Sequence, residues 1–394
     1  MISKLKNPYF ISQIISAGIA VVLLPILTRI MPQDEIGYYA EIMSFAFFIS
    51  VFIKFGSHQA ILVFLNETST KNEENLEFSG SFSIPFINFL ITIFVLIILS
   101  ITNVTPWIYL IAGPYALVDV VYANRLFYLR YKNLKYKYLS NTIALALITF
   151  IITVIAVVIS PTAESRLISI IVSFLIVIIL FHRYIPKLIL SKIFTKVSYF
   201  KYMGFGVWLA SMWLVVEFFN WFIINEISQE LGLSLTGRFS VVKTIFYQSA
   251  SILISVFDLI FIDNYYKKGE DYFKKHISKY LKLLVLILVL MWSISSFFEK
   301  DIIILLTGDE NYFRNDTWLN VFFATLIFRT LIFKPLYDNY KNKQTYYVFI
   351  SYVLSYGVGF TVFSLFEIEV LFSLLLLPMI LLNIFLRIIN YVKN

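Results

Sequence analysis

The chain has 394 residues, of which 59% are hydrophobic and 14% are charged, with a net charge of +8. Soluble proteins average about 45–50% apolar and about 25% charged residues, so this composition excludes an ordinary soluble protein. The absence of Cys excludes disulfides, thiolate metal sites and a thiol nucleophile, and the three widely spaced His residues predict no metal cluster.

The apolar residues fall into about twelve runs of roughly 20 residues, the length of helix that crosses a ~30 Å hydrocarbon core. The first run follows Lys4 and Lys6 and is interpreted as an uncleaved first helix rather than a signal peptide. We therefore predict an all-α polytopic membrane protein with about twelve transmembrane helices. In chain order the predicted spans are residues 8–30, 38–65, 79–101, 105–126, 139–160, 167–184, 200–227, 235–262, 281–298, 318–337, 347–366 and 370–392.

The basic residues predict the orientation of these spans. With the N-terminus and every second loop assigned to one side, that side holds 24 of the 32 Lys and Arg residues. Positive charge is retained in the cytoplasm, so both termini are predicted to be cytoplasmic. Arg125 lies near this surface and is interpreted as one of these orienting charges. The net positive charge is thus topological, and no nucleic-acid partner is expected.

A basic loop at residues 185–199 divides the spans into two sets of six. We predict an N-terminal bundle over residues 1–190, a C-terminal bundle over 191–394, and a central cavity between them. A weak repeat supports the division, because Gly37 and Gly237 open the second and eighth spans 200 residues apart. Each Gly has an aromatic residue two positions on and a hydroxyl residue seven positions on, although chance explains such a match equally well. Two bundles around a cavity are the geometry of alternating access.

The first span and the turn after it carry a more specific pattern. Residues 13–29 read QIISAGIAVVLLPILTR, residues 31–40 read MPQDEIGYYA, and Ser44, the pair Phe55 and Gly56, and Ala60 follow. This pattern resembles the N-terminus of Wzx-type polysaccharide flippases, the O-antigen and capsule exporters. These flippases belong to the multidrug/oligosaccharidyl-lipid/polysaccharide (MOP) exporter superfamily. Residues 306–313 (LTGDENYF) resemble the family's turn before helix ten more weakly.

The resemblance implies a flippase of polysaccharide biosynthesis, such as that of lipopolysaccharide, in the bacterial cytoplasmic (inner) membrane. It would move undecaprenyl-pyrophosphate-linked oligosaccharide across the membrane by ion-coupled rocking of two halves, and it would not be an enzyme. The implied partners are that lipid-linked oligosaccharide, membrane lipids and H⁺ or Na⁺, with a polysaccharide polymerase and a chain-length regulator as further partners. No cofactor is expected, since the chain has no phosphate-binding loop motif.

Cations inside the spans are the candidate substrate ligands, because each charge costs ~2.5–3.5 kcal/mol at the membrane centre. Lys54 and His58 are four residues apart and are expected to share one face of the second helix, where they would contact pyrophosphate. Lys243 lies in the eighth span, and Arg329 lies near the middle of the tenth, where its planar fork suits phosphate oxygens. Two alternatives to substrate binding remain open. The Lys54 side chain could extend to the membrane–water interface, and Arg329 could form an internal ion pair with Asp258 or Glu217.

Carboxylates inside the spans are the candidate ion-coupling groups. Asp119 and Glu217 would each take up a proton or hold Na⁺ during the cycle, and Asp258 and Glu41 are weaker candidates. The open alternative for each is a static salt bridge to a neighbouring Lys or Arg. Pro25 is a candidate hinge in the first span, although isolated Pro is tolerated in membrane helices.

The main alternative function is an integral-membrane polysaccharide polymerase (a glycosyltransferase) of the same pathway. Such enzymes also have ten to fourteen spans, but they typically expose a long outer loop rich in Arg. The longest predicted outer loop here, residues 299–317, contains only two basic residues, which favours the flippase.

Overall fold

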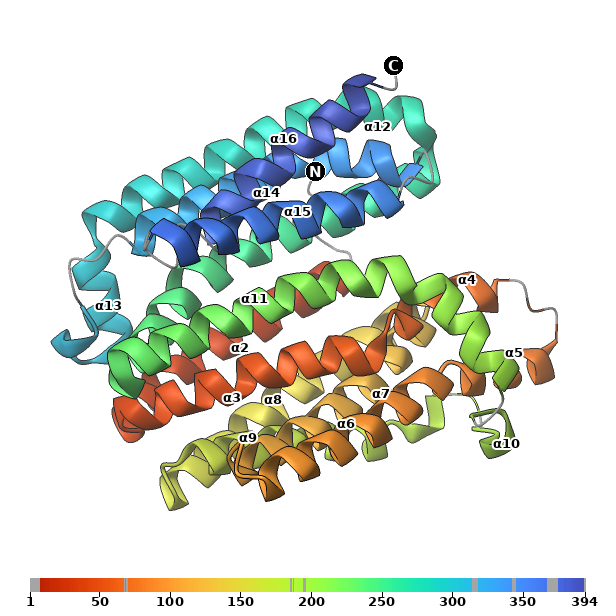
Figure 1. Ribbon diagram of the computed structural model, residues 1–394. Coiled ribbons are helices and arrows are strands. Elements are labelled where there is room, and N and C mark those ends of the chain that lie inside the picture. Colours follow the sequence, from red (N-terminus) through yellow and green to blue (C-terminus); the bar gives the residue numbers. More distant parts are fainter. Residues whose placement is uncertain are drawn as a thin grey trace. The chain divides into compact units, whose positions relative to one another are not determined.

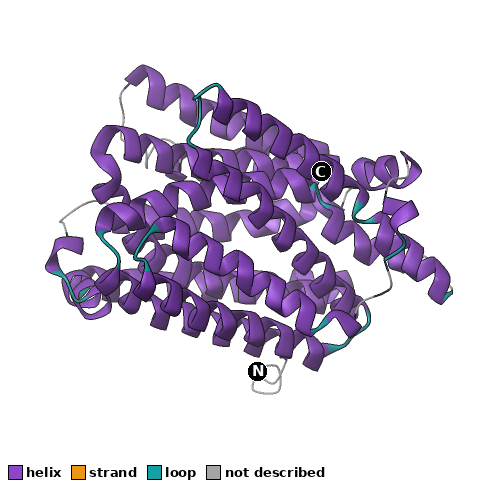
Figure 2. Cartoon of the chain, turned by 90° about the horizontal axis from the view of Figure 1, so that it is seen from below, coloured by secondary structure: helices purple, strands orange, loops and turns teal. Residues whose placement is uncertain are grey.

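The computed structural model describes residues 8–66, 68, 70–184, 186, 188–193, 196–313, 318–341, 345–366 and 375–392. These residues form helices joined by short connections and include no strand, as Figure 2 shows. The helices of the first half are α2 (Pro8–Ile30), α3 (Gln33–Lys54), α4 (Ser57–Leu65), α5 (Lys71–Gly80), α6 (Ser83–Ile101), η1 (Trp107–Ile111), α7 (Ala112–Tyr131), α8 (Lys135–Ile159), α9 (Ala163–Leu180), η2 (His182–Tyr184), α10 (Leu190–Ile193) and α11 (Lys196–Val242). Those of the second half are η3 (Lys243–Gln248), α12 (Ser249–Phe297), α13 (Glu299–Thr307), η4 (Glu310–Tyr312), α14 (Trp318–Lys341), α15 (Thr345–Phe366) and α16 (Leu377–Val392).

Every predicted span coincides with helix over all or most of its described residues, so the all-α membrane fold class is confirmed. Seven helices in the described part of the chain are long and apolar enough to cross a membrane, or eight when a bent pair is taken as one span, and two shorter apolar helices accompany them. Helix α7 is not among these seven, since Asp119, Asn124 and Arg125 lower its apolar character. A total of twelve crossings stays a prediction.

Two long helices extend beyond the predicted spans. Helix α11 covers the seventh span and the start of the eighth, and Gly232 interrupts it with non-helical angles (φ 86°, ψ 166°). Helix α12 continues through residues 263–280, which were expected to form a loop. Its Lys and Glu residues favour helix, and Gly269 is the residue there with the lowest helix propensity.

The chain forms two compact units whose boundary differs from a division after residue 190. Unit 1 comprises residues 1–12 and 38–225, and unit 2 comprises residues 13–37 and 226–394. Most of α2 therefore groups with the second half of the chain, and the first part of α11 groups with the first half. The division into two six-span bundles stays a prediction.

Unit 1 is organised around α7, which packs against α4, α6, α8 and α9. An apolar core in unit 1 joins α3, α7 and α9 through residues such as Ile42, Tyr115 and Phe174. In unit 2, α14 lies against α12, α15 and α16, as can be followed in Figure 1. These packings position the charged residues that were singled out from the sequence.

Within unit 2, the two glycines of the sequence repeat lie against each other. A Cβ atom on Gly37 would lie 1.9 Å from the carbonyl oxygen of Leu233, and one on Gly237 would lie 2.1 Å from that of Gln33. Gln33 and Leu233 are themselves 200 residues apart, so the contact is reciprocal between equivalent positions. Only Gly allows two backbones to approach so closely, which gives this weak repeat a structural basis.

Pro25 lies inside α2 and does not end the helix. Proline has no N–H to donate to the carbonyl four residues earlier, so the helix loses one backbone hydrogen bond there. Nearby, the Thr28 hydroxyl lies 3.1 Å from the Leu24 carbonyl oxygen and 3.2 Å from that of Thr307. The hinge role of Pro25 stays a prediction.

Candidate transport site

Lys54 and Asp119 form an ion pair within unit 1. Lys54 ends α3, and its Nζ atom lies 2.5 Å from Oδ2 of Asp119 on α7. The Ser50 hydroxyl, one turn earlier on α3, donates to the same oxygen at 2.5 Å. The exposed fractions of the two charged side chains are 20% and 18%. The structure thus pairs a candidate substrate cation with a candidate ion-coupling carboxylate, a pairing that the sequence left open.

The second span is interrupted between Lys54 and His58. Phe55 (φ 41°) and Gly56 (φ 74°) adopt left-handed angles, and α4 begins at Ser57. A Cβ atom on Gly56 would lie 2.9 Å from the Cα atom of Gly206, so the turn also depends on Gly at this position. The expectation that Lys54 and His58 share one continuous helix face is therefore wrong.

His58 lies on the far side of this turn and remains close to the ion pair. Its ring packs edge-on against Phe127, with centroids 5.0 Å apart, and it interacts electrostatically with both Lys54 and Asp119. Its Nδ1 atom is buried and has no hydrogen-bond partner among the described residues. Unit 1 thus brings Lys54, His58 and Asp119 together.

Glu217 lies on the part of α11 that belongs to unit 1. It accepts a hydrogen bond of 3.3 Å from Asn220, one turn later. Next to it, Phe218 and Trp221 pack against Phe48 of α3, and the Phe48 and Trp221 rings are stacked with centroids 6.3 Å apart. The face of α11 that carries this carboxylate is therefore lined with aromatic rings.

Unit 2 contains the remaining candidates. Lys243 begins the π-helix η3, and its Nζ atom lies 5.9 Å from the centroid of the Phe239 ring. Arg329, on α14, interacts electrostatically with Tyr352 of α15. Asp258 lies in α12, but its side chain is outside the described residues, so its predicted pairing with Arg329 stays a prediction. Single-turn π-helices occur frequently at functional sites, which singles out Lys243.

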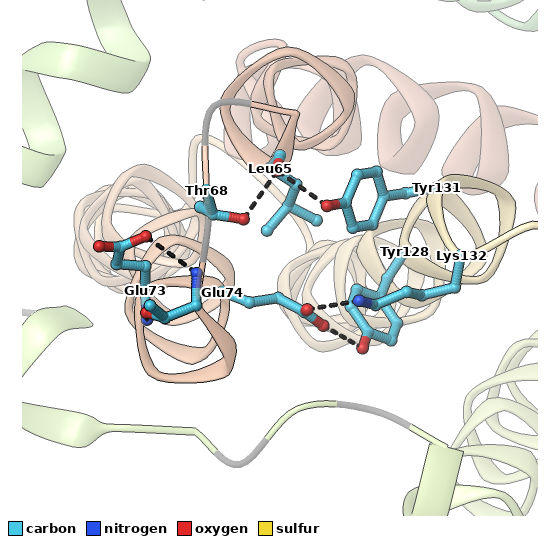
Figure 3. A network of polar contacts seen from close by, with 8 residues as sticks. Leu65, Thr68, Glu73, Glu74, Tyr128, Tyr131 and Lys132 are labelled. Atoms are coloured by element: carbon cyan, nitrogen blue, oxygen red, sulfur yellow. Dashed lines mark hydrogen bonds and ion pairs between the residues drawn. The ribbon is translucent and has the colours of Figure 1, made fainter.

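A second polar network, which the sequence did not indicate, joins α5 to α7 on the predicted cytoplasmic side. Glu74 is buried and accepts hydrogen bonds from the Tyr128 hydroxyl and the Lys132 ammonium (Figure 3). Burial and the bond to Glu74 raise the pKa of Tyr128, so the phenol keeps its proton and acts as the donor. In the same view, Tyr131 donates to the carbonyl oxygen of Leu65 at 2.9 Å. The network holds α5 and the last residue of α4 against α7.

Glu41 is one of the two weaker ion-coupling candidates. It accepts a hydrogen bond from the Tyr109 hydroxyl of η1. No group of three or more His, Asp or Glu side chains within the described ranges has the geometry to hold a metal ion.

A family model described as "Polysaccharide biosynthesis protein" matches residues 8–257, which is more than half of the chain. The chain belongs to this polysaccharide biosynthesis family. No curated protein matches its sequence.

Solved structures show that this family member has the fold of MATE transporters. The eukaryotic MATE transporter AtDTX14 matches with a TM-score of 0.63 at 13% identity, over 100% of this chain and 96% of that one. An inward-facing multidrug resistance MATE family transporter of the MOP superfamily matches with a TM-score of 0.64 at 11% identity, over 100% of this chain and 96% of that one. The outward-facing conformation of a MATE family transporter of the same superfamily matches with a TM-score of 0.60 at 13% identity, over 100% of this chain and 94% of that one. The predicted resemblance to the MOP superfamily is thereby confirmed at the level of the fold. The solved structures named here are transporters, and the likeness to them shows a transporter fold.

Proposed function

We propose that this polysaccharide biosynthesis family member is a flippase. It moves undecaprenyl-pyrophosphate-linked oligosaccharide repeat units across the bacterial cytoplasmic membrane by ion-coupled alternating access. The match of the polysaccharide biosynthesis family to a chain with a transporter fold supports this proposal most strongly. The polymerase alternative is weaker, because it requires an enzyme, and the matching structures are transporters.

The Lys54–Asp119 pair suggests how ion uptake and cargo binding are linked. While Asp119 is ionised, it neutralises Lys54 across 2.5 Å. A proton added to the carboxylate makes Asp119 neutral and leaves the Lys54 ammonium available for a phosphate oxygen of the cargo. Loss of that proton restores the pair and displaces the phosphate. In this scheme Lys54 and Asp119 act as one switch, with His58 beside it.

The other candidates have corresponding roles in the proposal. Lys243 and Arg329 are the cations of unit 2 that bind the pyrophosphate, and Glu217 and Asp258 are further ion-coupling groups. Pro25 would let the first helix bend. Both termini would be cytoplasmic, with the carrier lipid, H⁺ or Na⁺, a polymerase and a chain-length regulator as partners.

Export assays with single variants test the substrate ligands. Lys243→Ala and Arg329→Ala, each expressed in a strain that lacks the chromosomal gene, should reduce surface glycan while the amount of protein in the membrane stays unchanged. Normal surface glycan with both variants would contradict the assignment of these cations to the cargo.

A further inference from the structure

The first turns of α11 run in a different direction from the rest of the helix. The segment Lys196–Val207 is bent by 66° from the helix that continues at Ala210. From Ala210 to the interruption at Gly232, α11 has about 20 residues, which is enough to cross a ~30 Å hydrocarbon core. The segment before the bend is only about 18 Å long, because a helix rises 1.5 Å per residue. A transmembrane helix that stands upright would therefore place this segment close to the plane of the membrane surface.

One face of this segment is anchored to the rest of unit 1. Ser198, Tyr202 and Gly206 are spaced four residues apart, so they share that face. Tyr202 is 0% exposed, and its hydroxyl donates a hydrogen bond of 2.8 Å to the carbonyl oxygen of Glu77 on α5. A Cβ atom on Gly206 would lie 2.1 Å from the carbonyl oxygen of Phe55, in the turn before α4. The segment is therefore held in place by protein on one side.

The opposite face of the segment is exposed and apolar. Val197, Phe200 and Gly204 are spaced three and four residues apart along it. The Val197 side chain is 80% exposed and that of Phe200 is 57% exposed, and Phe205 beside them is 38% exposed. A helix that lies in the surface plane and turns such a face outward has the character of an interfacial helix, whose apolar face enters the boundary between headgroups and acyl chains.

The charge around this face is positive. Residues 182–207 include five Lys and Arg residues and no Asp or Glu. Lys196 is exposed, and its Nζ atom lies 5.9 Å from the centroid of the Phe200 ring, so a positive charge borders the apolar face. Lys201 has a different role, since it pairs with Glu77 at 2.8 Å and ties the segment to α5. Basic residues at a membrane surface are attracted to anionic headgroups, so the charge and the apolar face fit the same partner.

We propose that the segment Lys196–Val207 is an interfacial helix that binds anionic phospholipid of the cytoplasmic leaflet. Val197 and Phe200 enter the boundary between headgroups and acyl chains, and Lys196 contacts the lipid phosphate. The lipid thereby holds the first turns of α11 at the membrane surface. This contact does not depend on the proposed cargo, and the residues that make it are outside the predicted transport set.

The depth of a spin label on the exposed face tests the position of the helix. The chain has no Cys, and a Cβ atom on Gly204 would meet nothing within 4 Å, so Gly204→Cys provides a single, unstrained labelling site. The full-length protein is placed in vesicles of three parts phosphatidylcholine to one part phosphatidylglycerol, and oxygen is compared with a water-soluble nickel chelate as the relaxing agent. The label should lie about 5–10 Å below the headgroup surface. Asn72→Cys, in the exposed first turn of α5, is the matched control and should be open to the chelate. A label at residue 204 that is as open to the chelate as that control, or that lies at the bilayer centre, would overturn the proposal.

Brominated lipids test the preference for anionic headgroups. A fluorophore on the same Cys is quenched in the same lipid mixture, with either the phosphatidylglycerol or the phosphatidylcholine brominated. Phosphatidylglycerol should quench more than its share of the mixture, and Lys196→Gln should lower this preference about fivefold. Lys300→Gln is the control, since Lys300 is an exposed residue on the predicted outer side and should leave the preference unchanged. Phe200→Ser should move the label toward water. Quenching in proportion to the mixture, or an unchanged preference in Lys196→Gln, would refute the binding of anionic lipid.

Discussion

Asp119→Asn should destabilise unit 1, because it removes the charge that compensates Lys54. Removing one partner of a fully buried pair costs about 3–5 kcal/mol, whereas an exposed pair contributes about 0–1 kcal/mol. The Lys54 and Asp119 side chains are 20% and 18% exposed, and Ser50 adds a hydrogen bond of 2.5 Å to the same carboxylate oxygen. The expected loss therefore lies between these limits, at about 2 kcal/mol.

A double-mutant cycle measures the pair directly. Lys54→Met combined with Asp119→Asn removes both charges, so the double variant should recover much of the stability that Asp119→Asn loses. The assay is reversible unfolding of the purified protein in mixed micelles with increasing SDS, and the expected coupling is about 1–2 kcal/mol. Lys300 and Glu310 provide the matched control, since they lie 3.5 Å apart with exposed fractions of 53% and 74% and should show a coupling near zero.

Additive effects in the Lys54–Asp119 cycle, or an unchanged stability of Asp119→Asn, would refute the reasoning from burial and distance. The same variants separate stability from transport. If the pair is the proposed switch, the double variant should be stable in the membrane and yet export little glycan. Normal export by that variant would show that the pair is structural only.

Three further outcomes are expected. Gly237→Ala should cost about 1–3 kcal/mol in the same unfolding assay, because its new Cβ atom would lie 2.1 Å from a backbone oxygen, whereas Gly18→Ala, with nothing within 4 Å, should cost nothing. Glu74→Gln should cost about 1–3 kcal/mol and make α5 more sensitive to limited proteolysis, since it removes the charge that pairs with Lys132 of α7. Unchanged cleavage within α5 would contradict this. Charge-retaining Arg329→Lys should restore part of the export that Arg329→Ala loses, as measured by surface glycan, and no difference between the two would argue against a role for the positive charge.

The length of the apolar runs was sufficient to predict the membrane helices but not their interruptions or their extensions. A run of about 20 apolar residues has few alternatives to helix in a membrane, so the predicted spans coincide with helix. The turn at Phe55 and Gly56 packs against Gly206, which is 150 residues away in sequence. Membrane helices often contain Gly, so Gly56 alone did not show that the helix stops there. The argument that His58 follows Lys54 on one face was wrong for this reason.

Charges were correctly identified as unusual, but their partners depend on tertiary packing. The sequence placed Lys54 and Asp119 in different spans and could not show that α3 and α7 bring them together. Arg125 illustrates the opposite case, because a basic residue near a span end is typical of an orienting charge. Its burial becomes apparent only once α9 is packed against α7. The reciprocal contact of Gly37 and Gly237 likewise converts a weak sequence match into a structural one.

The lipid-linked intermediates of a strain that lacks this gene test the central claim most directly. In the assay, the carrier lipid is radiolabelled, and an impermeant reagent probes the oligosaccharides of the outer leaflet in intact spheroplasts. If the protein is a flippase, the strain without the gene should hold complete repeat units that the reagent reaches only after the cells are permeabilised. Wild-type protein should restore access. Single repeat units attached to the final carrier outside the membrane would contradict the proposal and indicate a polymerase instead.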